Sequence, residues 1–300
     1  MIRYLDLTKR FGTLTAVDGL NLAVEPGEVL ALLGPNGSGK TTALKSAAGL
    51  LAPTSGQVTV GSAGLPAGRP EARRCLSYLP QRVAFPDGLS GREVLEFYRR
   101  LRGVRSGRVE EVLRFASLNG AGARAVRTYS GGMTQRLGLA VALLPEAPIL
   151  LLDEPTAALD PDGLSAFYGE IERRRESGRT VCFTSHQLGD VERLADRFAV
   201  LVGGRLVALL TQAELADRLA ERGVLRVRLH SAEPGPLLEE VRKLAPRADW
   251  QGAQLVIPGH AADRPKVLAL LERAGAEILG LTTEEGRLDG LYRELVEAAR

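Results

Sequence analysis

Apolar runs separated by helical segments predict a parallel sheet in the first two thirds of the chain. Residues 29–33, 149–152 and 181–183 are apolar at every position, which is typical of strands buried on both faces. The segment 163–177 has the length of a helix that connects the last two of these strands. Strands and helices that alternate in this way predict an α/β core with helices on both faces of the sheet.

Half-polar strands precede this core. Residues 2–7 and 16–24 alternate between apolar and polar positions, and a polar segment at 8–12 is expected to form the turn between them. A further short strand is expected at 57–60. Alternation indicates strands with one buried face, so we expect an antiparallel sheet beside the parallel core.

A helical insertion interrupts the α/β pattern after a strand at 75–80. Residues 61–74 are rich in Gly, Pro and Arg, and we expect them to form a loop. Within 85–145, apolar residues recur at helical spacing with little strand signal. The α/β pattern then resumes and ends in a hairpin, 198–202 and 205–208, split by two glycines.

The composition shifts near residue 221, and a small α+β unit is expected beyond it. Its expected elements are the strands 224–229, 255–257 and 278–282 and the helices 236–244, 265–274 and 288–299. The sequence therefore predicts two domains, residues 1–221 and 222–300, as a length of 300 residues suggests at about 150 per domain.

Composition and charge place the chain among ordinary globular proteins. It is 45% hydrophobic and 25% charged, and its 39 basic and 36 acidic residues give a net charge of +3. The basic residues are spread along the chain, which indicates a solvated surface rather than a nucleic-acid interface. No run approaches the about 20 apolar residues of a membrane-spanning helix. If the protein serves a membrane, we therefore expect the spanning part on another chain.

The cysteines and the N-terminus favour a reducing, cytosolic compartment. Cys75 and Cys182 lie in apolar runs, so we expect buried thiols rather than a disulfide or a metal site. Residues 1–6 alternate as a strand does and lack the apolar core of a signal peptide.

A glycine-rich segment between the strand at 29–33 and a helical segment at 42–50 carries the first candidate chemistry. It matches the phosphate-binding P-loop, Gly-x-x-x-x-Gly-Lys-Thr, with Gly34, Pro35, Asn36, Gly37, Ser38, Gly39, Lys40, Thr41 and Thr42. Its glycines let the backbone bring N–H groups close to phosphate oxygens. We expect Lys40 to reach the β- and γ-phosphates and Thr41 to bind Mg²⁺. The alternative is a glycine-rich turn without a ligand.

Two adjacent acids, Asp153 and Glu154, end the apolar strand at 149–152. Buried charges are costly unless they are used, and ligands of parallel sheets bind at this edge. We expect Asp153 to hold Mg²⁺, usually through water, and Glu154 to take a proton from an attacking water. The alternative, two exposed acids that begin a loop, is weakened by the P-loop in the same chain.

Ser130, Gly131 and Gly132 form the third candidate site, at the start of a helix. Ser130 suits the N-cap position, and the glycines leave bare N–H groups at a helix N-terminus, where anions bind. Taken alone, an ordinary capped helix explains this segment equally well.

Together these motifs resemble the ATP-binding cassette (ABC) family, over residues 1 to about 220. The resemblance rests on their order along the chain: 34–42, Gln81, 130–132, 150–154, 158–160 and His186. Met133 stands where the family often has Gln. The resemblance implies a P-loop NTPase core with an antiparallel β subdomain and a helical insertion, ATPase activity, and ATP and Mg²⁺ as cofactors.

The resemblance also implies roles for single residues. Phe11 would stack on adenine, where the family more often has Tyr. Gln81 would contact Mg²⁺ and the γ-phosphate, and it would begin the insertion that touches a membrane partner. His186 would contact the γ-phosphate and orient the water, although a satisfied histidine at a strand end would otherwise be favoured. Asp160 would lie at a subunit interface.

The assembly that the resemblance implies is a homodimer. Two copies would hold two ATPs between them, each P-loop facing the 130–132 segment of the other copy. Closure would move a substrate, with export favoured, through a separate polytopic membrane permease at the cytoplasmic face of the plasma (inner) membrane.

Two narrower questions of identity follow from the resemblance. The single cassette with a C-terminal extension is similar to ABC-2 export ATPases, and residues 89–95 and 129–146 also resemble ATPases of copper-enzyme (nitrous oxide reductase) maturation. The alternative from another class is a soluble ABC ATPase acting on nucleic acid or ribosomes, which usually has two cassettes or large insertions. A switch GTPase is disfavoured by the 130–132 segment.

Overall fold

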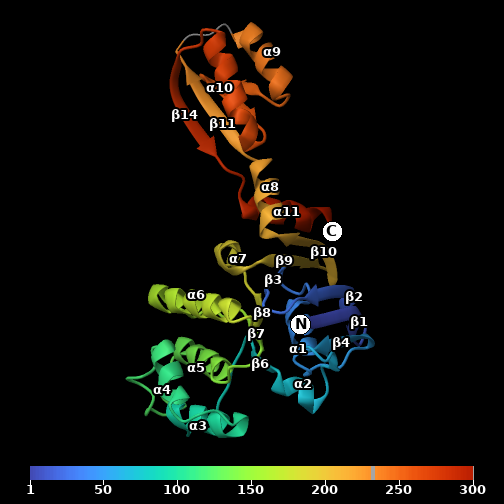
Figure 1. Cartoon of the computed structure of the whole chain (residues 1–300), viewed down its shortest axis with the longest axis vertical. Coiled ribbons are helices and arrows are strands. Elements are labelled where there is room, and N and C mark those ends of the chain that lie inside the picture. The colour runs from blue at the N-terminus through green and yellow to red at the C-terminus, as the bar shows by residue number, and fades with distance from the viewer. Residues whose placement is uncertain (231–233, 300) are drawn as a thin grey trace. The chain divides into compact units, whose positions relative to one another are not determined.

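The chain folds into two compact units, which are described separately. The computed structural model describes residues 1–230 and 234–299 (Figure 1). The first unit comprises Met1–Leu209 with Ala299, and the second comprises Leu210–Ala298. Composition places the boundary between residues 221 and 222, whereas the structure divides the chain between Leu209 and Leu210. The two differ by one helix, α8 (Gln212–Ala220), which belongs to the second unit.

A six-stranded sheet forms the centre of the first unit. Its strands are β3 (Val29–Leu33), β6 (Leu76–Leu79), β7 (Ile149–Asp153), β8 (Thr180–Thr184), β9 (Arg197–Val202) and β10 (Arg205–Thr211), in the order β10-β9-β3-β8-β7-β6. Strands β9, β3, β8, β7 and β6 pair in parallel. Every residue of β3, β7 and β8 is buried. The prediction that the apolar runs form a buried parallel sheet is therefore confirmed.

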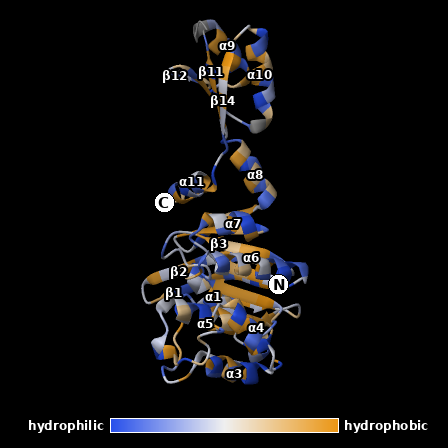
Figure 2. Cartoon of the chain, turned by 90° about the vertical axis from the view of Figure 1, so that its left-hand side faces the viewer, coloured by the Kyte–Doolittle hydropathy of each residue, from blue (hydrophilic) through white to orange (hydrophobic). Residues whose placement is uncertain are grey.

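Helices α1 (Lys40–Ala47), α6 (Pro161–Glu176) and α7 (Leu188–Leu194) follow strands of this sheet. Helix α1 contacts β7 and β8, and α6 contacts β8 and buries Phe167 and Ile171. In Figure 2 the central strands are strongly hydrophobic, whereas the helices around them mix hydrophobic and hydrophilic residues. Helix α7 was not predicted, because seven residues are too few to show a helical period.

A four-stranded sheet completes the β structure of this unit. Strands β1 (Ile2–Phe11), β2 (Leu14–Val24), β4 (Ser55–Val60) and β5 (Leu65–Pro66) have the order β2-β1-β4-β5, with antiparallel pairing. The predicted turn at 8–12 is wrong, because β1 continues to Phe11 and the turn follows at Gly12. Asp6, with a φ of 50°, lies where the register between β1 and β4 shifts. This irregularity interrupts the alternation by which a strand is recognised.

The predicted loop at 61–74 is also wrong in part, because it contains β5 and the short helix α2 (Pro70–Arg74). Both elements are too short for a periodic pattern, and the two residues of β5 are placed by pairing with β4.

The helical insertion is confirmed. It consists of α3 (Gly91–Arg102), α4 (Arg108–Phe115), the short 3₁₀ helix η1 (Val126–Thr128) and α5 (Gly131–Leu143) (Figure 1). Ser90 and Glu93 form a capping box at the start of α3, and Gly103 ends the helix in the left-handed conformation that glycine adopts easily.

The second unit has a strand–helix–strand–strand–helix–strand core. Its elements are β11 (Val224–Leu229), α9 (Pro234–Leu244), β12 (Asp249–Gln251), β13 (Gln254–Pro258), α10 (Arg264–Arg273) and β14 (Ile278–Glu284), with η2 (Ala261–Asp263) before α10 and α11 (Leu288–Ala298) at the end. The sheet is antiparallel, in the order β12-β13-β11-β14, which is the ferredoxin-like arrangement. The sequence pattern missed β12, a strand of three residues, and therefore did not identify this topology.

Phe167 and Phe97 form a matched pair for testing the packing of the first unit, since Phe167 on α6 is fully buried and Phe97 on α3 is 59% exposed. We expect Phe167→Ala to lower the free energy of unfolding by about 3–5 kcal/mol, because it removes a buried ring and leaves a cavity. We expect Phe97→Ala to change it by about 0.5 kcal/mol or less. Urea denaturation followed by circular dichroism measures both, and equal losses would contradict the assignment of α6 to the core.

Candidate active site

The P-loop joins the end of β3 to the start of α1, and its shape depends on glycine at two positions. Gly34 has a φ of 149°, and a Cβ atom there would lie 2.2 Å from the carbonyl oxygen of Leu201. Gly39 has a φ of 99°, and its Cβ would lie 2.5 Å from the carbonyl oxygen of Ala16. Any side chain at either position would collide with backbone, so the loop conformation requires both glycines.

Lys40 begins α1 and lies folded over the loop. Its Nζ donates hydrogen bonds to the carbonyl oxygens of Gly34, at 2.7 Å, and Pro35, at 3.0 Å. Burial lowers the pKa of Lys40, and the negative charges of Glu154 and Asp153 oppose that shift. The ammonium group therefore lies within electrostatic reach of both acids, at the start of a helix whose first N–H groups suit an anion.

Asp153 and Glu154 are held by one hydroxyl group on the neighbouring strand. Thr184 Oγ1 donates a hydrogen bond to Asp153 Oδ1, at 2.8 Å, and accepts one from the backbone N–H of Glu154, at 2.9 Å. This contact follows from the parallel pairing of β7 with β8, in which Asp153 lies opposite Thr184. Glu154 has a φ of 56°, a conformation uncommon for a residue with a side chain and often found at functional sites.

His186 follows β8 and reaches Glu154. Its Nε2 lies 2.5 Å from Glu154 Oε1, and 46% of the His186 side chain is exposed, against 19% of Glu154. The structure therefore brings together a lysine, two carboxylates and an imidazole that are up to 146 residues apart in the sequence (Lys40 to His186). They converge because β3, β8 and β7 are adjacent parallel strands that end at the same edge of the sheet.

The other predicted metal ligands lie at this edge too. Gln81 comes two residues after β6, which pairs in parallel with β7 so that Leu79 lies opposite Leu152. Thr41 is in the first turn of α1, next to Thr42, which the sequence predicts to bind phosphate. Within the described residues, Asp153 Oδ2 is buried and has no hydrogen-bond partner. A buried carboxylate oxygen without a donor suits a hard cation such as Mg²⁺.

Four other residues named from the sequence lie outside the group formed by Lys40, Asp153, Glu154 and His186. Ser130 caps α5 by accepting a hydrogen bond from the N–H of Met133, at 3.2 Å, and both Ser130 and Gly131 are exposed. Asp160 caps α6 through the N–H of Gly163. Phe11 is 47% exposed at the end of β1, with Lys9 Nζ 5.1 Å from its ring centre.

The sequence analysis missed a buried aspartate that contacts the segments carrying Glu154 and His186. Asp190 on α7 is 2% exposed and accepts hydrogen bonds from the hydroxyls of Thr156, Tyr168 and Ser185, at 2.6–2.9 Å. It thereby ties the segment after Glu154 to the segment before His186. Burial, together with the hydrogen bond to Asp190, raises the pKa of Tyr168 to about 12. The sequence signal for this cluster was the pair of polar residues Thr184 and Ser185 at the end of an apolar strand.

Comparison with known proteins identifies the family. The family described as ABC transporter matches residues 17–157. The chain is 30% identical to the linearmycin resistance ATP-binding protein LnrL of Bacillus subtilis (strain 168), covering 98% of each chain. It is 35% identical to the daunorubicin resistance ATP-binding protein DrrA3 of Streptomyces coeruleorubidus, over 96% of this chain and 93% of the relative.

A third relative and a solved structure agree with this result. The chain is 34% identical to the Nod factor export ATP-binding protein I of Rhizobium etli, over 93% of this chain and 88% of the relative. The fold is similar to a dimeric ATP-binding cassette in a post-hydrolysis state bound to ADP and Pi, with a TM-score of 0.65 and 27% identity, covering 71% of this chain and 99% of that chain. Within the described residues, no helix has both the length and the apolar character to cross a membrane. The chain therefore belongs to the ABC transporter family, as an ATP-binding and ATP-hydrolysing subunit of the exporter type.

Proposed function

We propose that this chain works as a homodimer that powers export through a separate polytopic membrane permease, at the cytoplasmic face of the plasma (inner) membrane. The observation that carries the proposal is the gathering of Lys40, Asp153, Glu154 and His186 at one sheet edge, together with an exposed 130–132 segment. The names of the similar proteins, which refer to linearmycin resistance, daunorubicin resistance and Nod factor export, support the direction of transport.

The P-loop binds the phosphates of ATP in this proposal. Gly34, Asn36, Gly37, Ser38, Gly39, Lys40, Thr41 and Thr42 form the cradle. Lys40 exchanges its two carbonyl partners for β- and γ-phosphate oxygens, which is favourable because the new partners are negatively charged. Phe11, a ring exposed at the end of β1, stacks on the adenine.

Thr41, Gln81 and Asp153 would hold Mg²⁺, which neutralises charge on the β- and γ-phosphates. The support for Asp153 is its buried and unpartnered Oδ2, combined with the hydrogen bond from Thr184 that fixes its other oxygen.

Glu154 is the general base in this proposal. It accepts a proton from the attacking water while the water oxygen bonds to the γ-phosphorus and the bond to the β–γ bridging oxygen breaks. His186 contacts the Glu154 carboxylate and orients it toward the water and the γ-phosphate. The Thr184 hydroxyl holds the Glu154 backbone in place by accepting a hydrogen bond from its N–H.

The second copy supplies the other side of the site. Its Ser130, Gly131 and Gly132 present a helix N-terminus to the γ-phosphate, and the exposure of Ser130 and Gly131 in this chain leaves them available to do so. Closure of the two copies on ATP, followed by hydrolysis and reopening, is the stroke transmitted to the permease.

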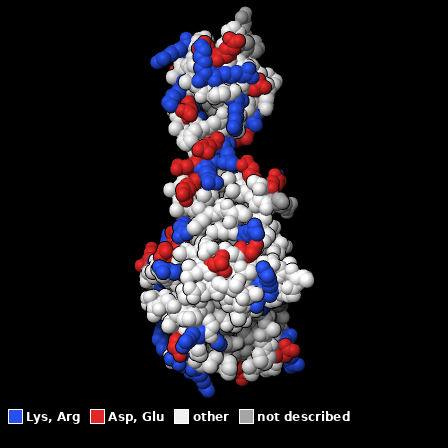
Figure 3. All heavy atoms as spheres, turned by 90° about the vertical axis from the view of Figure 1, so that its right-hand side faces the viewer, with Lys and Arg blue, Asp and Glu red and all other residues white. Residues whose placement is uncertain are grey.

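The face shown in Figure 3 does not favour the nucleic-acid alternative. Acidic and basic side chains are interspersed on that face rather than gathered by sign. Nucleic acid binds to a patch or stripe of basic residues. This face has no such stripe among the described residues.

Glu154→Gln tests the assignment of the base. We expect kcat for ATP hydrolysis to fall about 10²–10⁴-fold, because an amide cannot accept the proton. ATP binding is expected to persist and the closed dimer to accumulate. Phosphate release and size-exclusion chromatography with ATP measure these effects, with Glu176→Gln at the exposed end of α6 as the control. Turnover like that of the wild type would remove Glu154 from the mechanism.

Thr184→Val tests the hydroxyl that holds both acids. The substitution keeps the shape of a fully buried side chain but leaves Asp153 Oδ1 without its donor. We expect a loss of about 10–100-fold in ATPase activity or Mg²⁺ affinity, as for other residues that support metal ligands. Thr59→Val on β4 is the control. If Mg²⁺ titrations of ATPase activity give the same curve for Thr184→Val and wild type, the hydroxyl has no positioning role.

Affinity purification from detergent extracts tests the partner. We expect the tagged chain to co-purify with a polytopic membrane protein. Recovery of nucleic acid that is released by salt, without such a protein, would instead support the soluble alternative.

A further inference from the structure

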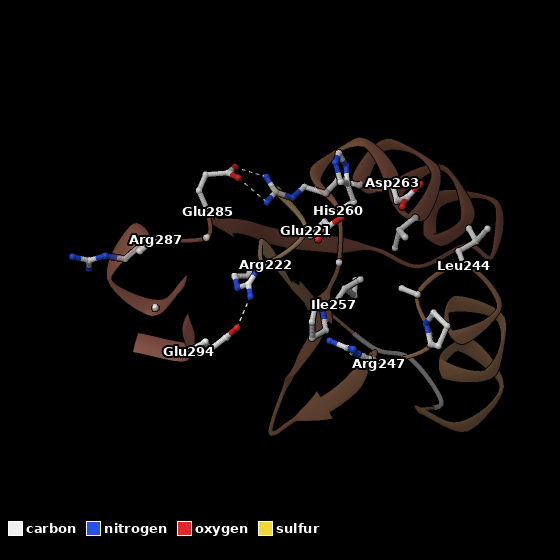
Figure 4. A pocket seen from close by; sticks show the side chains of 18 of the residues that line it. Glu221, Arg222, Leu244, Arg247, Ile257, His260, Asp263, Glu285, Arg287 and Glu294 are labelled. Atoms are coloured by element: carbon white, nitrogen blue, oxygen red, sulfur yellow. Dashed lines mark hydrogen bonds and ion pairs between the residues drawn. The ribbon is translucent and has the colours of Figure 1, made fainter. Parts of the chain in front are cut away.

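A cavity of about 1100 Å³ lies within the second unit (Figure 4). It is formed where the ends of α9, β13 and β14 meet the starts of α10 and α11 and the segment after α8. Its volume slightly exceeds the range for small-molecule sites, about 300–1,000 Å³. All of its lining residues belong to the second unit, so it is separate from the P-loop residues and the acids of the ATP site.

One part of the cavity wall is apolar. It consists of Leu244, Ala245, Pro246, Ile257, Pro258 and Val267. Ile257 and Val267 are buried members of the core of this unit, whereas Leu244, at the end of α9, is 43% exposed. A large apolar side chain left in solvent beside a cavity favours a ligand with an apolar body.

Most carboxylates of the wall are already neutralised. Arg222 pairs with Glu294, and Arg264 makes a bidentate pair with Glu285, as the dashed lines in Figure 4 show. Asp289 pairs with Arg287, which points away from the cavity in that view. Asp263 pairs with Lys266. These acids therefore contribute little net negative charge to the cavity.

Among the described residues the cavity wall holds five arginines and five acids, but its arginines without an ion-pair partner outnumber its acids without one. Within residues 1–230 and 234–299, Arg247 and Arg293 have no ion-pair partner, and the acid in the wall without one is Glu221. In Figure 4 the Arg247 side chain extends toward the middle of the cavity, close to Ile257. A guanidinium group without a carboxylate partner forms strong, charge-assisted hydrogen bonds to an anion, so an anionic ligand would be stabilised here.

We propose that this cavity binds a small organic anion with an apolar body. The anionic group lies against the guanidinium groups of Arg247 and Arg293, and the apolar body lies against Leu244 and its neighbours in the wall. The site does not depend on the ATPase mechanism, and its test does not require turnover.

The fluorescent anion 8-anilinonaphthalene-1-sulfonate, used with the full-length chain, tests the proposal. Trp250 is the single tryptophan and lies on β12 of the same unit, so energy transfer from Trp250 to the probe reports binding there. We expect saturable binding of one probe per chain. Octanoate should displace it, whereas octanol, which lacks the charge, and acetate, which lacks the apolar chain, should need at least tenfold higher concentrations.

Variants of the wall separate this site from general surface binding. We expect Arg247→Gln combined with Arg293→Gln to weaken probe binding at least tenfold, and Arg228→Gln, at an exposed position on β11, to leave it unchanged. Leu244→Ala alters a side chain that is already exposed, so the fold should persist, and it should weaken the probe and octanoate alike. Wild-type affinity in the double variant or in Leu244→Ala, or equal displacement by octanol and octanoate, would overturn the proposal.

Discussion

The pairing of β7 with β8 is the contact on which the candidate active site of the first unit depends. It sets Asp153 opposite Thr184, so that one hydroxyl donates to the Asp153 carboxylate and accepts from the Glu154 backbone. A shift of one residue in this pairing would turn these side chains to the other face of the sheet. Every residue of both strands is buried, so such a shift would require the closely packed side chains on both faces to repack and would move polar Asp153 and Thr184 away from each other. The positions of Asp153 and Glu154 at the strand ends are therefore fixed by the packing of β7 and β8.

The rest of the site extends this arrangement outward from the sheet. Asp190, three positions after Gln187, binds hydroxyls from both loops and so couples the segment after Glu154 to the one before His186. On the other side of β8, β3 ends in the P-loop, where close backbone contacts at Gly34 and Gly39 leave space for no side chain. The carboxylates and the imidazole thus lie at or just after the ends of adjacent strands, and the lysine begins the helix after a third, which suits groups that must hold their geometry.

The second unit follows a different plan. Its ferredoxin-like sheet buries alternate residues of β11 beneath α9 and α10, while polar residues occupy the intervening positions. Paired arginines and carboxylates surround a cavity at the ends of these elements, and the charge that remains unpaired is mostly positive. In the first unit, polar groups at the strand ends form hydrogen bonds with one another. In the second unit, arginines in the cavity wall remain without a carboxylate partner among the described residues.

The sequence by itself determined the nucleotide chemistry and most of the elements. Gly34, Lys40, Asp153 and Glu154 belong to local motifs, and runs such as 29–33 are apolar at every position, so neither signal needs a contact from elsewhere in the chain. Only the tertiary structure decided three features: the part of β1 beyond the irregularity at Asp6, the two-residue strand β5, and the topology of the second unit. That topology depends on β12, a strand of three residues that forms by pairing with β13. The roles of Thr184 and Asp190 were hidden for the same physical reason. Thr184 and Asp190 become part of the site through partners 31 and 34 residues away in the sequence, and one-dimensional patterns do not record such partners.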